Sequence, residues 1–288
     1  MSIESLQKRI KTTEDLRGIV NTMKTLSSVS ILQYEQANTT LKAYRENLKN
    51  AFWALVKIYG IPQIPAVRGN QRYLLVLFGS DSGMVGKFNK EILSNVHEWL
   101  HAKKLKRNDV MLITVGKRIT MLAEQEKFKI FAKYASANSA KAVGSIAEAV
   151  IIKIEQAINK HHINNVVLWY HKRSKQSVEL MKRKILPFNT DSLVRLKDKK
   201  WPTNNVPQIT VKPEKLFSAL VDQSLIISVV TMLNYSLAAE HFLRMTNMQN
   251  AEKNIDDNLE ELNLTFQQMR QEQITGELID VVAGYQAM

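Results

Sequence analysis

The sequence predicts an α+α/β fold, in which a long antiparallel two-helix coiled coil made by both ends of the chain carries an inserted three-layer α/β domain. Three observations predict it. Apolar residues recur at steps of three and four over residues 1–58. The same spacing returns over 214–286 and is typical of helices that present one face to a partner. Between these arms, over 70–190, short apolar runs alternate with amphipathic segments, which is typical of α/β domains.

The N-terminal arm predicts one helix. It contains a single glycine, Gly18, and no proline before residue 58, with fraying expected only near 38–40. At 1.5 Å per residue such a helix is roughly 85 Å long. A helix of that length does not fit inside a compact domain, so we expect it to pair or to project.

The middle of the chain predicts a sheet covered by helices. Tyr73–Phe78 and Val110–Val115 are continuous apolar runs, which are typical of buried parallel strands. The other expected strands are 129–134, 166–170 and 178–186, and the expected helices are 88–105, 117–124 and 139–160. Glycines and prolines predict linkers at 60–69 and 191–213.

The C-terminal arm has the most regular pattern in the chain. From Ile255 the apolar residues follow strict steps of four and three through Leu259, Leu262, Phe266 and Met269. This keeps one seam on one side of the helix and requires a partner helix. The N-terminal arm is the candidate partner, so residues 1–58 and 214–286 are expected to form one unit.

Composition restricts the chemistry. The chain has 288 residues, is 45% hydrophobic and contains no cysteine, which excludes disulfides, cysteine-ligated zinc and thiol catalysis. Its N-terminus resembles neither a signal nor a transit peptide. The most apolar run, Ser224–Leu233, is too short to span a bilayer. We therefore expect a soluble protein.

Charge is unevenly distributed along the chain. The net charge is +13, with +16 in residues 59–213 and −7 in residues 214–288. A basic middle part suits an anionic partner such as nucleic acid, lipid headgroups or an acidic protein face, and it equally suits a solvated surface. Charge alone leaves these alternatives open.

Two stretches superficially match catalytic or phosphate-binding motifs. His97–His101 reads H-E-x-x-H, the zinc-protease spacing, but a third ligand and a cleft are not indicated. Gly79–Lys87 lies between a strand and a helix, where phosphate loops occur. Its glycine spacing matches neither a Walker A loop nor a dinucleotide loop, and Asp81 occupies the nucleophile-elbow position. A solvated helix face and a tight turn are the expected structures.

Two further candidates are basic. His161 and His162 fall where a helix is expected to end, where a cation complements the helix dipole. The patch Lys172, Arg173, Lys175 and 182–184 would suit nucleic acid, although its neighbours Trp169 and Tyr170 lie in an apolar strand. The sequence indicates no arrangement that combines a nucleophile, a general base and an oxyanion site. We therefore expect no catalytic, cofactor-binding or metal residues, and a chain that is not an enzyme by itself.

Both arms and the middle turn carry a family resemblance. The matching N-terminal residues are Arg9, Ile10, Lys11, Ile19, Met23 and Lys24. The matching C-terminal residues are Ala239, Glu240, His241, Arg244, Met245, Met248, Ala251, Asn254, Leu264, Thr265, Phe266, Arg270, Gln271, Ile274, Thr275 and Glu277. The matching turn residues are Gly79, Ser80, Asp81, Gly83, Gly86, Phe88 and Asn89. In this order and over the whole chain, the sequence resembles the γ subunit of F-type ATP synthase. Ser82, Val85 and Lys87 depart from the family pattern.

The resemblance implies a central rotary shaft. Such a shaft transmits torque between a membrane c-ring driven by protons or sodium ions and an α3β3 ring whose catalytic sites lie on β, with the ε subunit beside the middle domain. It implies ring contacts by Met23, Lys24, Arg244, Arg270, Gln271 and Thr275. It also implies peripheral membrane association, no nucleic acid, and a place on the cytoplasmic face of a bacterial plasma membrane. A basic nucleic-acid-binding α/β protein with a coiled-coil scaffold is the alternative.

Overall fold

The protein is described by a computed structural model that covers residues 2–61, 72–175, 177–188, 191–197, 201, 205 and 207–286. Most of the predicted first linker, and part of the second, lies outside these residues. The elements in chain order are α1 (Ile3–Tyr59), β1 (Tyr73–Phe78), α2 (Phe88–Ala102), η1 (Arg107–Asp109), β2 (Val110–Val115), α3 (Lys117–Gln125), β3 (Ile130–Tyr134), α4 (Ala140–His161), β4 (Asn165–Arg173), β5 (Val178–Leu186), α5 (Asp191–Lys197) and α6 (Pro213–Gln286).

The chain forms two compact units. Residues 1–28 and 244–288 make the first, and residues 29–243 make the second. The long helices α1 and α6 each contribute to both units, and α1 runs without a break through the predicted fraying point at residues 38–40.

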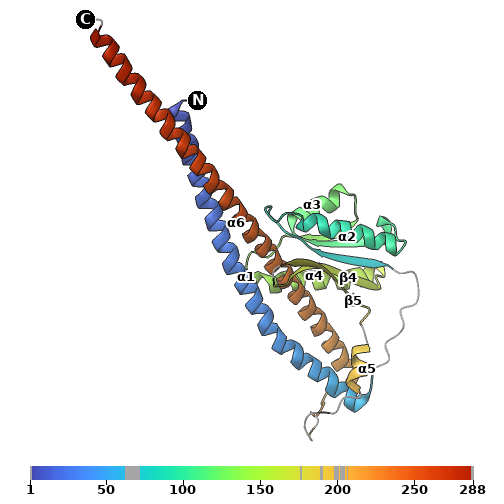
Figure 1. The fold of residues 1–288 in the computed structure, drawn as a ribbon. Coiled ribbons are helices and arrows are strands. Elements are labelled where there is room, and N and C mark those ends of the chain that lie inside the picture. Colours follow the sequence, from blue (N-terminus) through green and yellow to red (C-terminus); the bar gives the residue numbers. More distant parts are fainter. Residues whose placement is uncertain are drawn as a thin grey trace. The chain divides into compact units, whose positions relative to one another are not determined.

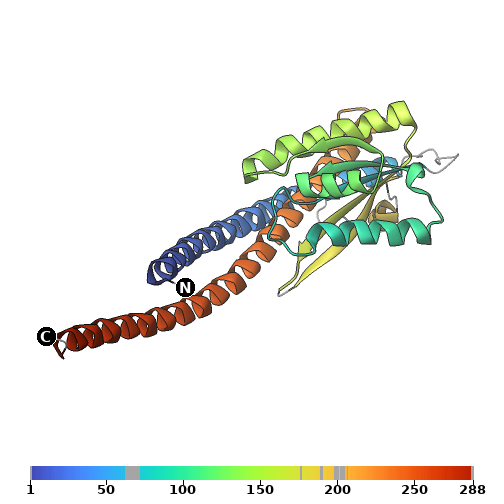
Figure 2. The ribbon, with the colours of Figure 1, turned by 90° about the horizontal axis from the view of Figure 1, so that it is seen from above.

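The first unit is an antiparallel helix pair. Arg17 Nε lies 2.8 Å from Asp256 Oδ1, and Lys24 Nζ lies 2.5 Å from Glu252 Oε2, so positions rise on α1 as they fall on α6. The predicted seam is confirmed, because Leu259 and Leu262 are buried and the other seam residues are half-buried. Figures 1 and 2 show α6 continuing beyond the N-terminal end of α1.

The second unit contains a five-stranded sheet in the order β3-β2-β1-β4-β5. Strands β1, β2, β3 and β4 pair in parallel, and β5 runs antiparallel to β4 at one edge. The prediction of buried parallel strands is confirmed, since all six residues of β1 and of β2 are buried. The strands expected at 129–134 and 178–186 are confirmed as β3 and β5, which lie at the two edges of the sheet.

Helices cover both faces of the sheet, which confirms the three layers. On one face, Leu75, Leu77 and Leu112 pack with Ile92 of α2 and Ile119 of α3. On the other face, alternate strand residues pack with α4. The same core includes α6 residues Val229, Met232, Leu233, Leu237 and Ala238. The middle part of α6 is therefore a layer of the α/β core as well as half of a helix pair.

This packing buries part of the apolar run of α6. By length and composition α6 contains a stretch that would suit a membrane span, with a mean hydropathy of 1.8 over 18 residues. However, Val229, Met232 and Leu233 in its most apolar run are buried against the sheet. A core helix passes the same composition test as a membrane span.

The second predicted linker is partly wrong, because α5 lies inside it. Leu193 and Leu196 are three positions apart, so they share one face of this short helix. Both are buried with Phe52 of α1 and Leu220 of α6. Within the second unit α1 and α6 are again antiparallel, since the Tyr34 and His241 rings stack at 5.8 Å and Tyr44 Oη donates to Gln223 Oε1 at 3.0 Å.

Candidate functional site

The turn after β1 depends on two glycines. A Cβ added at Gly79 would collide with the Ile119 side chain and the Asn89 amide oxygen. A Cβ at Gly116 would lie 2.7 Å from the Gly79 carbonyl carbon, and the φ of Gly116 is +121°. Only glycine allows the ends of β1 and β2 to approach this closely. Gly79 N donates to Val115 O at 2.8 Å across this contact.

Polar side chains then fasten the turn to its surroundings. Asn89 accepts a hydrogen bond from Ser80 N at 3.0 Å and donates one to Ser80 Oγ at 2.8 Å. Asp81 Oδ1 accepts from Lys117 N, at the start of α3, and from Ser136 N, each at 2.8 Å. One carboxylate oxygen therefore joins three segments, and it also lies where a negative charge complements the dipole of α3.

These bonds account for the motif without a bound phosphate. Its backbone and side-chain groups bond to other parts of the second unit, and Gly86 adopts a φ of +61°, which favours glycine. The predicted tight turn between strand and helix is confirmed. The motif residues Gly79, Ser80 and Asp81 act as a structural clasp in this chain.

The H-E-x-x-H stretch lies on α2, with its first histidine already engaged. His97 Nε2 hydrogen-bonds Glu126, and the His97 ring lies 5.3 Å from the Phe128 ring. His101 is exposed. Across the described ranges, no group of three His, Cys, Asp or Glu residues is arranged to hold a metal ion. His161 ends α4 and His162 adopts the left-handed cap conformation, as expected of a helix end.

Part of the basic patch is bound within the second unit. Arg173 Nη1 lies 2.9 Å from Glu35 Oε1, and its guanidinium lies 4.5 Å from the centre of the Phe242 ring. Lys172 lies 5.2 Å from the Tyr235 ring centre. Trp169 and Tyr170 are buried, as predicted, and so cannot stack with bases. These contacts give Lys172 and Arg173 a structural role, whereas residues 182–184 are exposed.

Two buried titratable groups lie in the second unit. Burial, together with the nearby Glu240 carboxylate, raises the pKa of Tyr34 to about 12. Burial also lowers the pKa of His171, against the opposing effect of its hydrogen bond to the Glu91 carboxylate, which accepts. The His171 ring is fully buried and stacks on Phe88 at 4.0 Å. Both groups are therefore neutral near pH 7 and serve the packing.

Three of the six expected ring contacts are partly covered within the chain. Met23 is half-buried. Lys24 is half-buried in its ion pair with Glu252. Arg244 is only 7% exposed. Sequence reasoning missed the Lys24–Glu252 pair, although the basic N-terminal arm and the acidic C-terminal arm contained the signal.

The other three residues lie on the exposed end of α6. Arg270, Gln271 and Thr275 are all exposed. Thr275 Oγ1 donates to Gln271 O at 2.8 Å, while Gln273 donates to Glu277 at 2.8 Å. In the described part of the chain, Arg270 takes part in no ion pair or side-chain hydrogen bond. Neither Glu272 nor Glu277, the acidic residues nearest to it toward the end of α6, pairs with Arg270 in the described structure.

The same end of α6 exposes large apolar side chains. Their exposed fractions range from 47% for Ile274 to 69% for Val281. The set comprises Ile274, Leu278, Ile279, Val281 and Val282. Residues 270–282 include no buried position. A contiguous apolar surface of this kind marks an interaction site, and sequence reasoning missed it because it considered only the paired seam.

Comparisons with known proteins cover nearly the whole chain. The family model described as ATP synthase matches residues 2–288. The ATP synthase gamma chain of Geobacter metallireducens is 25% identical over 293 residues, covering 100% of this chain and 99% of that protein. The ATP synthase gamma chain of Aquifex aeolicus is 26% identical over 297 residues, covering 100% and 98%.

Solved structures share the fold at low identity. The rotor of the Euglena gracilis mitochondrial ATP synthase, in rotational state 1, aligns with a TM-score of 0.62 at 15% identity, over 94% of this chain and 98% of that chain. The central stalk and c-ring structure of the Tetrahymena thermophila mitochondrial ATP synthase gives a TM-score of 0.54 at 18% identity, over 81% and 99%.

Proposed function

This chain belongs to the ATP synthase family, and we propose that it is the central rotary shaft, which carries torque between a membrane c-ring and an α3β3 ring. The observation that carries the proposal is the exposed apolar end of α6, residues 270–282. Such a surface needs a cover, and none of the described residues provides it. A ring of other subunits closed around the end of α6 would exclude this surface from water.

The mechanism we propose is a differential contact. A helix pair has chemically different sides, so each subunit of a surrounding ring meets a different set of side chains at each angle. If those contacts favour one conformation of a catalytic subunit over another, rotation shifts its affinity for nucleotide. The complex is the enzyme, and we assign the catalytic sites to the β subunits and no catalytic residue to this chain.

We assign the direct ring contacts first to Arg270, Gln271 and Thr275. Arg270 has a guanidinium available for bidentate, charge-assisted bonds to carboxylates of the ring. Gln271 and Thr275 lie one turn apart on the same helix face. The proposal extends to Met23, Lys24 and Arg244, whose covered side chains would offer the ring a smaller surface.

The second unit would form the foot of the shaft. We propose that residues 70–190 meet the c-ring and the ε subunit, while the arms 1–58 and 214–286 act as the axle. Exposed cations on β5, namely Lys182, Arg183 and Lys184, supply a basic surface for that contact. The assembly would lie on the cytoplasmic face of a bacterial membrane and be driven by protons or sodium ions. The comparisons give no support to nucleic-acid binding.

The test uses the complex reconstituted with α, β, ε and the membrane sector. We expect Arg270→Ala to lower coupled ATP synthesis about tenfold or more, because loss of a charge-assisted bond costs about 1.5–3 kcal/mol. Gln271→Leu should lower it about fivefold, because loss of a neutral hydrogen bond costs about 1 kcal/mol. The matched control is Lys253→Ala, another exposed cation on α6. Unchanged synthesis and hydrolysis in both variants would refute the assigned contacts.

A further inference from the structure

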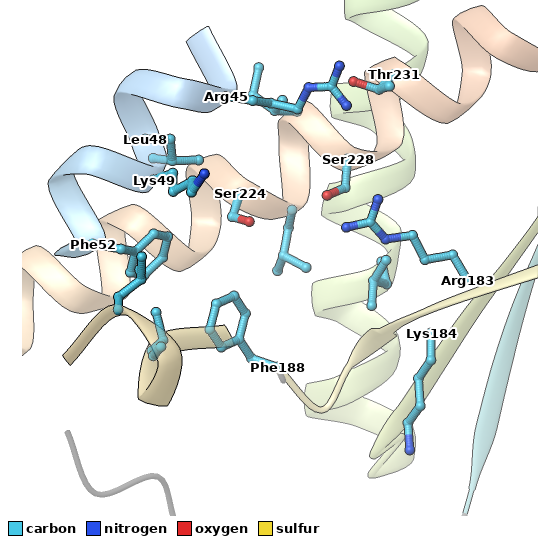
Figure 3. A pocket seen from close by; sticks show the side chains of 15 residues that line it. Arg45, Leu48, Lys49, Phe52, Arg183, Lys184, Phe188, Ser224, Ser228 and Thr231 are labelled. Carbon is cyan, nitrogen blue, oxygen red and sulfur yellow. The ribbon is translucent and has the colours of Figure 1, made fainter. Parts of the chain in front are cut away.

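A cavity of about 360 Å³ lies in the second unit. Its walls come from α1, from β5 and the residues that follow it, from α5 and from α6, as Figure 3 shows. These segments are far apart in the sequence, so no local motif marks the cavity. Its volume falls within the range of small-molecule sites.

One side of the cavity is apolar. Phe52 of α1 and Phe188 after β5 stack with their ring centres 5.6 Å apart. Leu48, Leu193 and Leu196 complete this wall. The surface suits a hydrocarbon chain, because aliphatic and aromatic carbons offer it dispersion contacts and exclude water.

Besides further apolar residues, the lining contains four cations, and the described residues place no carboxylate in it. The cations are Arg45, Lys49, Arg183 and Lys184. Lys49 has a weak local partner in Glu46, at 3.4 Å. Arg45 and Arg183 make no ion pair or hydrogen bond within the described part of the chain. Figure 3 shows both guanidinium groups extending toward α6, whereas Lys184 points away.

The α6 wall adds three hydroxyl groups. Ser224, Ser228 and Thr231 are four and three residues apart, which places them on one helix face. Thr231 is only 3% exposed, and its Oγ1 has no hydrogen-bond partner among the described residues. Buried hydroxyls are almost always bonded. An unpaired hydroxyl that lines a cavity therefore points to a missing acceptor there.

We propose that this cavity binds an anionic amphiphile, a single hydrocarbon chain with a carboxylate or phosphate head group. The head group lies between Arg45 and Arg183 and accepts hydrogen bonds from the α6 hydroxyls. The hydrocarbon chain lies along Phe52 and Phe188. The lining matches each part of such a ligand: cations for its charge, hydroxyls for its oxygens and apolar carbons for its tail. The inference does not depend on the rotary role.

Calorimetric titration of the full-length chain tests this binding. The probes are dodecanoate and dodecyl phosphate below their micelle concentrations, with dodecanol and dodecyltrimethylammonium as neutral and cationic controls. We expect saturable, one-to-one binding of at least one anion. Arg183→Gln should weaken it about tenfold, through loss of a charged hydrogen bond. Lys182→Gln, an exposed β5 neighbour outside the lining, should leave it unchanged.

Thr231→Val supplies an independent readout, because it keeps the side-chain shape and removes the hydroxyl. We expect roughly fivefold weaker binding of the favoured anion by a folded variant. Preference for dodecanoate would identify a fatty acid as the source, and preference for dodecyl phosphate a phospholipid head group. Absence of saturable anion binding, equal binding of dodecanol, or equal losses in Arg183→Gln and Lys182→Gln would each overturn the proposal.

Discussion

Asp81 provides the sharpest test of the clasp after β1. Its Oδ1 accepts two backbone hydrogen bonds at 2.8 Å, from Lys117 and from Ser136. Bonds to a charged acceptor contribute about 1.5–3 kcal/mol each. Because the Asp81 carboxylate is only half-buried, we take the lower value for each bond. Asp81→Ala should therefore reduce the free energy of unfolding by about 3 kcal/mol.

Asp81→Asn separates geometry from charge. Its amide oxygen still accepts hydrogen bonds, so the expected loss is only about 1 kcal/mol. Urea unfolding followed by tryptophan fluorescence measures both losses, since Trp99 and Trp169 lie in the core that packs against α3. Glu98→Ala on the exposed face of α2 is the control. If Asp81→Ala is no less stable than this control, the clasp has no energetic importance.

Three further predictions concern the helices. Lys24→Ala and Glu252→Ala should show a coupling free energy of about 0.5–1 kcal/mol in a double-mutant cycle, because their ion pair is only partly exposed. In the reconstituted complex, Lys24→Ala should lower ATP synthesis more than Glu252→Ala; equal losses would limit Lys24 to the helix pair. Thr231→Val should stabilise the ligand-free chain by about 1–2 kcal/mol, measured by urea unfolding, because it removes an unpaired buried hydroxyl; a destabilised variant would contradict this. The raised pKa of Tyr34, about 12 against 10.0, makes its protonated form stabilising below pH 10, a contribution that is lost between pH 10 and 12. Tyr34→Phe should therefore lose less unfolding free energy than the unmodified chain across that interval, and parallel losses would refute the assignment.

The regular elements could be predicted because their physical signals are local. A seam such as Ile255–Met269 needs only the period of a helix, and a buried strand such as Tyr73–Phe78 needs only a continuous apolar run. The clasp was predicted as a turn from its glycines. Its hydrogen bonds were not, since Asp81 bonds to residues 36 and 55 positions away.

The features that were missed depend on tertiary contacts. Among the described side chains of α5, Leu193 and Leu196 form its buried face, too few to show a period in a segment expected to be a linker. The apolar run of α6 indicates a segment that avoids water, but it does not identify the sheet against which the segment packs. Arg270 illustrates the same limit at the proposed site. Several carboxylates lie near it in the sequence, but the sequence alone does not show whether its guanidinium pairs with any of them.

The uncovered tip of α6 affects how the cell must produce this protein. Five large apolar side chains between Ile274 and Val282 remain in water until another subunit encloses them. Copies made in excess would adhere to one another or to chaperones through these tips. The exposed apolar side chains at the end of α6 therefore require balanced synthesis with the enclosing subunits, or rapid proteolysis of surplus copies.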